Sequence, residues 1–450
     1  MHCYYRSVGS VLILVLSLTG VCFLKAMANV SKHQMNSKGE YEKLAAEMEN
    51  ILQRDVLGVW FPGSVDKQNG GFLSNFSRDW KPAATDGKFS VFQGRMVWVA
   101  AQVMEHRPEL KTQFEPILAH GFTFLSDVLW DQTDGGFFWG LDENGKVSER
   151  YTDGKHLYGM SFGLYGATAA YQATKDKRAL TLAQKAFQWM DQHAHDSTNG
   201  GYSEWLTRKG AVVQRRSGDA GVPVAGFPIG YKSMNTHIHL LESFTQLYEV
   251  WPDETLRRRL EELLKIVRDR ICVEPGVMNL YFTPDWRPIP DHDSYGHDVE
   301  TAYLILEAEA ALSHGTTQKT EAMARALVDH ALAYGWDKQN GGFYRDGTTF
   351  GVAEDKRKEW WVQFEGLNAL LLMHEKYGRD DGRYYEAFKQ QWSFIKEHQV
   401  DKEFGGVFDT VEENGSVTDY TKSRIWKECY HETRALLNAI ERLKKLTQVK

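Results

Sequence analysis

Asp66-Lys-Gln-Asn-Gly-Gly-Phe72 is the first of five near copies of one motif in this 450-residue chain. The other copies begin, in order, at Asp131, Asp196, Asp337 and Asp401. Neighbouring copies are about 65 residues apart, except that the third interval is about twice as long. A degenerate copy is therefore expected near Glu274-Pro-Gly276. Such a period is typical of repeat folds, in which each unit buries its apolar face against its neighbours.

Two helical segments lie between successive copies of this glycine motif. Residues 89–104 are apolar on nearly every side, whereas the segments equivalent to residues 255–265 carry a charged face. A helix that is apolar all round belongs inside a protein, and one with a charged stripe belongs outside. Each repeat is therefore predicted to be a hairpin of an inner and an outer helix. The glycine pair allows a turn with positive φ, and short β-hairpin strands are expected beside it.

The two ends of the chain predict a closed ring. The helix 40–52 precedes the first glycine motif without an inner partner, and the helix 428–446 has no outer partner after it. Pairing these two helices gives six hairpins, whereas an open solenoid would need a polar cap at each end. The sequence thus predicts an all-α ring of six inner and six outer helices in one domain, residues 29–450.

The composition is that of a globular protein without a charged partner. The chain is 42% hydrophobic and 25% charged, and its net charge is -7 without a run of basic residues. This excludes nucleic acid and an anionic membrane surface as expected partners. Fourteen Trp and twenty Tyr residues suit an uncharged polar ligand such as a sugar, although most of them are expected to belong to the core.

The first residues have the pattern of a secretory signal. Arg6, the apolar run 11–18 and Ala26-Met-Ala28 predict a leader over residues 1–28 and export to the periplasm or the medium. If translation begins at Met27 or Met35 instead, the protein is cytoplasmic. No later stretch is long and apolar enough to span a bilayer, so no stable membrane insertion is expected after leader cleavage.

Polar residues recur near the start of each predicted inner helix, where apolar helices have no structural need for them. They are Arg95, Tyr158, His237, His239, His297, Glu300, Trp361, Glu365 and His431. The ring would bring them to one mouth of the barrel. His239-x-x-Glu242 and His297-x-x-Glu300 place each Glu on the face of its His, which it could orient. A metal site is the weaker interpretation, because no local zinc spacing is present.

Five stretches carry a resemblance to a known family. They are Phe92-Gln-Gly-Arg95, Asn235-Thr-His-Ile-His239, Ser294-Tyr-Gly-His-Asp-Val-Glu300, Lys358-Glu-Trp-Trp-Val-Gln-Phe-Glu365 and Trp426-Lys-Glu-Cys-Tyr-His431. In this order they resemble the motifs of the N-acylglucosamine 2-epimerase superfamily, and most closely those of its cellobiose 2-epimerase branch. The resemblance extends from about Glu40 to the C-terminus.

The resemblance implies an (α/α)6 barrel that epimerises C2 of the reducing-end sugar of a β-1,4-linked disaccharide, without a cofactor or a metal. The substrate would be cellobiose, with mannobiose and lactose as further candidates, and the oligomeric state, monomer or dimer, stays open. The implied catalytic residues are the acid/base histidines His297 and His431 and the enediolate-stabilising Arg95. The implied substrate-binding residues are Asn235, His239, Glu300, Glu365, Trp361 and Trp426, with Tyr303 at a position where relatives often carry Trp.

The chemistry of C2 epimerisation agrees with these residue types. A proton must be removed beside the aldehyde and returned to the opposite face, which suits two imidazoles on different walls and a cation near the enediolate. The alternatives on the same barrel are an aldose–ketose isomerase and an N-acylglucosamine 2-epimerase. A glycoside hydrolase using Glu300 and Glu365 as its carboxylate pair, or a sugar-binding protein without activity, is a more distant alternative.

Overall fold

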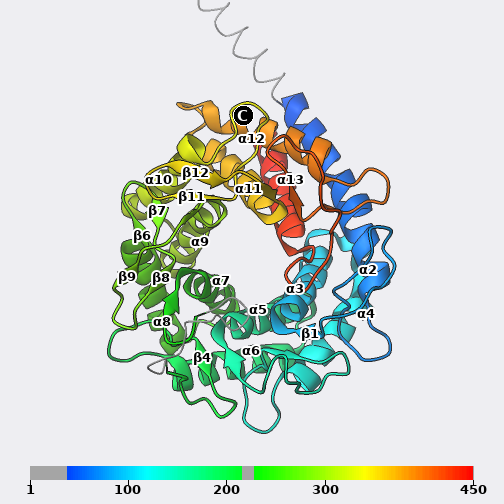
Figure 1. Ribbon diagram of the computed structural model, residues 1–450, viewed down its shortest axis with the longest axis vertical. Helices are drawn as coiled ribbons and strands as arrows, with labels where there is room; N and C mark the ends of the chain where they lie inside the picture. The colour runs from blue at the N-terminus through cyan, green and yellow to red at the C-terminus, as the bar shows by residue number, and fades with distance from the viewer. Residues whose placement is uncertain (1–37, 215–227, 449–450) are drawn as a thin grey trace, which may run out of the picture.

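Six inner helices surround the central axis of a closed ring in the computed structural model (Figure 1), which describes residues 38–214 and 228–448. The inner helices are α3 (Ser90–His106), α5 (Leu157–Thr174), α7 (Met234–Val250), α9 (Tyr295–Ser313), α11 (Trp360–Tyr377) and α13 (Tyr430–Leu446). They are buried on nearly every side: in α5, each residue from Leu157 to Ala170 is buried. The predicted leader, residues 1–28, lies outside the described residues.

Six outer helical segments surround the inner ring, and several end in a π-helical turn. They are 38–51 with η1 (Leu52–Leu57) and α2 (Gly58–Ser64), η2 (Pro108–Leu110) with α4 (Lys111–Phe124) and η3 (Leu125–Leu129), α6 (Lys177–Ala194), α8 (Glu254–Ile266) with η4 (Val267–Ile271), α10 (Gln318–Tyr334), and α12 (Arg383–Phe394) with η5 (Ile395–Gln399). The buried residues of α8 are Leu256, Leu260, Leu263, Leu264 and Ile266, which form one apolar stripe beside a charged face.

The ring closes where the sequence predicts it. The N-terminal helix (blue in Figure 1) lies beside α13 (red), and α13 also packs against α3 and α11. The expected all-α (α/α)6 barrel is therefore confirmed. Cys272 and Cys429, the two cysteines after the predicted leader, are free buried thiols. A search of the described residues finds no helix with the length and apolar character needed to cross a membrane.

Short strands connect neighbouring repeats. The strands are β1 (Lys88–Phe89), β2 (Gly140–Leu141), β3 (Lys155–His156), β4 (Trp205–Leu206), β5 (Lys232–Ser233), β6 (Cys272–Val273), β7 (Val277–Met278), β8 (Tyr281–Phe282), β9 (Pro288–Ile289), β10 (Asp293–Ser294), β11 (Asp346–Thr348), β12 (Val352–Asp355), β13 (Lys358–Glu359) and β14 (Thr410–Val411). The strand before an inner helix pairs antiparallel with a strand of the next loop, as β1 pairs with β2. These loops join outer helices to inner ones, so they share one end of the barrel with the N-termini of the inner helices.

Each glycine motif folds as a tight turn. In the first copy the carboxylate of Asp66 accepts the N–H groups of Gln68 and Asn69, and Gly70 and Gly71 have φ values of +82° and +64°. Glycine adopts this left-handed region without the steric cost that a side chain brings. In the predicted degenerate copy, β6 and β7 form a hairpin around Gly276, so the hairpin is kept although the motif is lost.

A buried lysine before the inner helix holds each of the five intact motifs. Its ammonium group pairs with the carboxylate of the motif's first residue, which gives every such loop an internal cation. The Nζ···Oδ2 distances are 2.6 Å (Lys88–Asp66), 3.1 Å (Lys155–Asp131), 2.8 Å (Lys232–Asp196), 2.8 Å (Lys358–Asp337) and 3.0 Å (Lys422–Asp401).

In three repeats a second tie, a side-chain hydrogen bond to the motif's backbone, comes from the residue five positions after that lysine. Gln93 and Gln363 accept the N–H of the motif's aromatic residue at 2.8 and 2.9 Å, and each donates to the carbonyl of the same residue. His237 takes this position in the third motif, where its Nε2 accepts the Tyr202 N–H at 3.1 Å. Its Nδ1–H donates to the Ser233 carbonyl at 2.7 Å, so the neutral imidazole is fully used.

The hydrogen bonds of the neutral His237 side chain predict that the free energy of unfolding depends on pH. Burial lowers the pKa of His237 to about 3, whereas an unfolded histidine titrates near its ordinary value of about 6.5. Between these values the unfolded chain binds the extra proton, so stability is complete above about pH 6.5 and falls as the pH is lowered, by up to about 1.4 kcal/mol per pH unit. His237→Gln, the residue of two other repeats, should keep the neutral-pH stability and reduce this slope.

Denaturant unfolding between pH 7 and pH 5 measures the effect. His292→Gln is the matched control, because His292 is exposed and should leave the slope unchanged. A His237→Gln slope equal to that of the unchanged chain would contradict the assignment.

Candidate active site

The predicted site residues lie just before the inner helices or within their N-terminal halves, near one end of the barrel. Four of them are partly exposed, namely Asn235, His297, Trp361 and Trp426, and the others are buried beneath them. The Oδ1 atom of Asn235 makes no hydrogen bond to any described residue. The site is thus an open rim of aromatic and polar groups above a buried polar floor.

His431 is oriented by a carboxylate from the neighbouring helix. Its Nδ1 lies 2.5 Å from Oε1 of Glu365, and the side chain is 4% exposed. Because an ionised carboxylate only accepts, Nδ1 carries the proton and Nε2 is the free, basic nitrogen. Burial, with the positive charge of Arg95, lowers the pKa of His431 well below its ordinary value. The imidazole is therefore neutral at pH 7, with Nε2 unprotonated.

His297 has a different partner from the one that the His-x-x-Glu spacing predicts. Its Nδ1 lies 2.8 Å from the hydroxyl of Ser294, the residue before α9, whereas Glu300 binds Arg434. The prediction that Glu300 orients His297 is wrong, because a buried guanidinium competes for that carboxylate. Burial lowers the pKa of His297 to about 4, so this imidazole is also neutral at pH 7.

Trp361 stands between the two histidines. The centroid of its ring is 4.7 Å from that of His297 and 5.9 Å from that of His431. The Trp361 indole N–H donates to Glu359 at 2.7 Å, which fixes the ring. Helix α11 lies between α9 and α13, so the two imidazoles come from opposite sides of one partly exposed indole.

The sequence did not single out Arg434, which forms the centre of the floor. Its guanidinium contacts the carboxylates of Glu242, Glu300 and Glu365, which come from three other inner helices. Burial alone would lower the pKa of Arg434, but Glu365 and the other acidic neighbours raise it well above its ordinary value. His431 and Arg434 are three residues apart on α13 and share one face, a spacing that offers a weak sequence signal.

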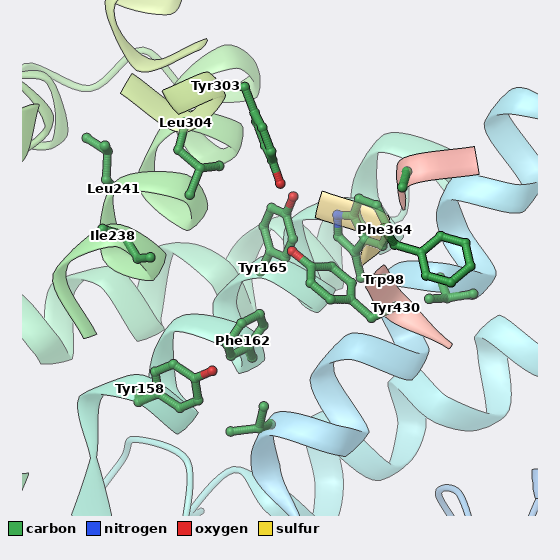
Figure 2. Close-up of a cluster of buried hydrophobic side chains, with 14 of the residues drawn as sticks. Trp98, Tyr158, Phe162, Tyr165, Ile238, Leu241, Tyr303, Leu304, Phe364 and Tyr430 are labelled. Atoms are coloured by element: carbon green, nitrogen blue, oxygen red, sulfur yellow. The ribbon is translucent and has the colours of Figure 1, made fainter. Parts of the chain in front are cut away.

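Tyrosine hydroxyls complete this floor. Figure 2 shows the rings of Tyr165, Tyr303 and Tyr430 with their hydroxyl groups directed into one region between the inner helices. Tyr303 donates to Oε2 of Glu365 at 2.6 Å, and Tyr430 donates to Oε1 of Glu242 at 2.6 Å. Tyr303, the departure from the family pattern, is buried and acts on the carboxylate that orients His431.

Arg95 forms a second buried cation next to this floor. Its Nη1 donates to Glu428 at 3.1 Å and its Nη2 to the hydroxyl of Tyr158 at 3.2 Å. Burial alone would lower the pKa of Arg95, but Tyr158 and Glu428 raise it above its ordinary value. Its Nε makes no hydrogen bond to a described residue. Trp426, on the rim, lies 6.2 Å between ring centroids from Tyr158, the residue whose hydroxyl Arg95 contacts.

His239 behaves as its sequence spacing predicts. Its Nδ1–H donates to Oε2 of Glu242 at 2.9 Å. Burial would raise the pKa of Glu242, but Arg434 and His239 lower it to about 2. Glu242 is therefore ionised and holds His239 with its Nε2 free.

The geometry disfavours a glycosidase pair at Glu300 and Glu365. Both carboxylates bind the same nitrogen, Nη2 of Arg434, so they lie together at one buried cation. A hydrolase needs one protonated carboxylic acid, and the two groups must flank the scissile bond. The imidazoles of His297 and His431, not the carboxylates, are the groups suited to proton transfer at the mouth.

Residues 70–435 match the family model of N-acylglucosamine 2-epimerase (GlcNAc 2-epimerase). The chain belongs to this family. A cellobiose 2-epimerase of Bacteroides fragilis is 28% identical over 89% of this chain and 99% of its own length. The solved structure of cellobiose 2-epimerase from Spirochaeta thermophila is 28% identical, with a TM-score of 0.81 over 90% of this chain and 98% of that one. A D-mannose isomerase of Marinomonas mediterranea is 22% identical over 86% and 95%.

Membership in the family makes the protein an enzyme of the carbohydrate epimerase and isomerase class. The enzymes of this class named above act on sugars, so a sugar is the expected ligand of the mouth that His297, Trp361 and His431 form. The family match covers the whole rim, from Arg95 to His431.

Proposed function

We propose that this protein epimerises C2 of the reducing-end sugar of a β-1,4-linked disaccharide, with cellobiose as the first substrate to test. The observation that carries the proposal is the pair of neutral imidazoles, His297 and His431, on either side of Trp361. The similarity to cellobiose 2-epimerases over nine-tenths of the chain supports the choice of a disaccharide.

The proposed reaction starts from the open-chain sugar. One imidazole Nε2 takes the C2 proton, and the electron pair moves toward the aldehyde oxygen to give an enediolate. The first imidazolium returns its proton to solvent, and the second imidazole takes a proton from solvent beside the enediolate anion and delivers it to the opposite face of C2. General acid–base help of this kind contributes about 10²–10⁴ in rate. Arg95 is the cation proposed to stabilise the enediolate, and the partly exposed Trp361 and Trp426 are proposed to hold the sugar rings.

The test is an incubation of purified protein with cellobiose in D2O, followed by chromatography and NMR of the products. Glucosyl-mannose with deuterium at C2 is the expected product, because a proton held by histidine exchanges with solvent. Lactose, mannobiose, mannose and N-acetylglucosamine in parallel incubations define the preferred sugar. Release of glucose from cellobiose would overturn the proposal in favour of hydrolysis, and binding of every sugar without turnover would mean a binding protein.

An aldose–ketose isomerase is the second candidate, supported by the similarity to a D-mannose isomerase. It would form the same enediolate and return the proton to C1, so the product would be a ketose with deuterium at C1. The NMR spectrum separates the two outcomes.

A further inference from the structure

The degenerate fourth repeat lacks the internal cation of the five intact motifs. Asp293 in β10 occupies the position that Lys88, Lys155, Lys232 and Lys358 take in the strands before four other inner helices. The motif aspartate that would pair with a lysine is also missing, because the loop here is the hairpin of β6 and β7. The repeat has therefore exchanged a buried ammonium for a buried carboxylate.

The second tie of the repeat is replaced in the same way. Asp298 lies five residues after Asp293, the position of Gln93, His237 and Gln363 in other repeats. Those side chains accept the N–H of the motif's aromatic residue. Neither oxygen of Asp298 has a hydrogen-bond partner among the described residues. Two acidic side chains thus face each other here. In other repeats the lysine at the first position pairs with an aspartate, and the side chain at the second position accepts a backbone N–H.

A histidine from the outer helix α10 completes the group. His330 Nδ1 lies 3.4 Å from Asp293 Oδ2 and 3.8 Å from Asp298 Oδ2. Asp293 and Asp298 are 0% exposed and His330 is 4% exposed. None of their six polar atoms makes a hydrogen bond to the described part of the chain. One atom from each residue lies within 4.8 Å of the other two, so all three side chains converge.

Burial of this group without a cation is costly. Asp293 and Asp298 are both completely buried, and their carboxylates converge on one imidazole, so two free carboxylates would repel each other there without contact to water. Unpaired buried charges and unsatisfied buried polar atoms each cost several kcal/mol at most sites. The five intact repeats meet the same requirement with lysine, whose ammonium is absent here.

We propose that Asp293, Asp298 and His330 bind a divalent first-row transition-metal ion, of the zinc or manganese class. Two ligand atoms about 2.0–2.2 Å from one ion at a tetrahedral angle are about 3.3–3.6 Å apart, close to the 3.4 and 3.8 Å found here. The imidazole favours these ions over calcium and magnesium, which prefer oxygen ligands alone. The ion takes the place of the missing ammonium.

The site lies at the start of the helix that carries a candidate base. Asp293 precedes Ser294, the partner of His297, and Asp298 follows His297 directly. An ion there ties the first turn of α9 to α10.

The test uses tag-free full-length protein purified from cells grown with added zinc or manganese, because a buried site fills as the chain folds. Elemental analysis should find about one ion per chain in the unchanged protein and less than about a tenth of that in Asp293→Asn/His330→Gln. The metal-bound chain should also have a midpoint of thermal unfolding a few degrees above that of the same chain refolded with EDTA.

Two further variants sharpen the result. His292→Ala removes an exposed histidine beside the site and should keep the ion, which excludes adventitious surface binding. Asp293→Lys restores the residue of the other repeats and should lose both the ion and the sensitivity to EDTA. Unchanged protein without bound metal from either growth, or Asp293→Asn with a raised midpoint of thermal unfolding, would overturn the proposal and favour a carboxyl pair that shares a proton.

Discussion

His431→Asn should lower kcat for epimerisation by about 10²–10⁴-fold while the barrel remains folded. The asparagine amide can still donate to Glu365, so the buried hydrogen bond that His431 makes at 2.5 Å is kept while the basic nitrogen is lost. Stopped assays with cellobiose measure the rate, and circular dichroism measures folding. His292→Asn, an exposed histidine on the loop before α9, is the matched control and should be fully active.

A site with two bases predicts a more specific result than loss of turnover. Each imidazole faces one side of C2, so His431→Asn and His297→Asn should each retain exchange of the C2 hydrogen with D2O for one epimer only. The two variants should differ in which epimer exchanges. If either variant epimerises at the normal rate, that histidine is not an acid or base in the reaction. If one variant loses exchange for both epimers while the other keeps exchange for both, a single-base mechanism replaces the proposed one.

Arg434→Met should destabilise the folded chain by about 3–5 kcal/mol, because it leaves three buried carboxylates without their shared cation. Glu242, Glu300 and Glu365 all bind this one side chain, which is 4% exposed. The free energy of unfolding in urea measures the effect. Arg442→Met is the matched control on the same helix.

The control separates the loss of a buried cation from the loss of any arginine on α13. Arg442 pairs with Glu375 where both side chains are about one-fifth exposed. Its loss should cost clearly less than that of Arg434, because it leaves one partly exposed carboxylate without a partner instead of three buried ones. Equal losses in the two variants would contradict the central role assigned to Arg434.

Much of the barrel could be predicted from the sequence, because the regular spacing of the repeats determines where each helix lies in the ring. The spacing of about 65 residues between Asp66, Asp131 and Asp196 placed each inner helix, and the first turns of those helices then formed one rim. The role of Arg434 could not be predicted from the sequence, because its partners are far away in the chain: Glu242 is 192 residues distant. A pairing of that kind leaves no local pattern.

The same reasoning explains one correct and one wrong pairing. His-x-x-Glu predicted the contact of His239 with Glu242, since both lie on one helical face. The identical spacing failed for His297, because Ser294 and Arg434 compete for the two side chains. Spacing determines which residues can meet, whereas the neighbouring helices decide which contacts form. The cluster at Asp293, Asp298 and His330 was missed for a related reason, since its members come from three different elements.

Helix α13 supplies both His431 and Arg434, and it is the last inner helix to leave the ribosome. A nascent chain that has not yet released α13 carries Arg95, His239 and His297 but has neither His431, the second proposed base, nor Arg434, the cation of the floor. During synthesis, Glu242, Glu300 and Glu365 therefore lack the guanidinium that they share in the folded barrel, and the ring is still open. The set of proposed catalytic residues should therefore be completed in the same step as the final gain in stability, when α13 closes the barrel.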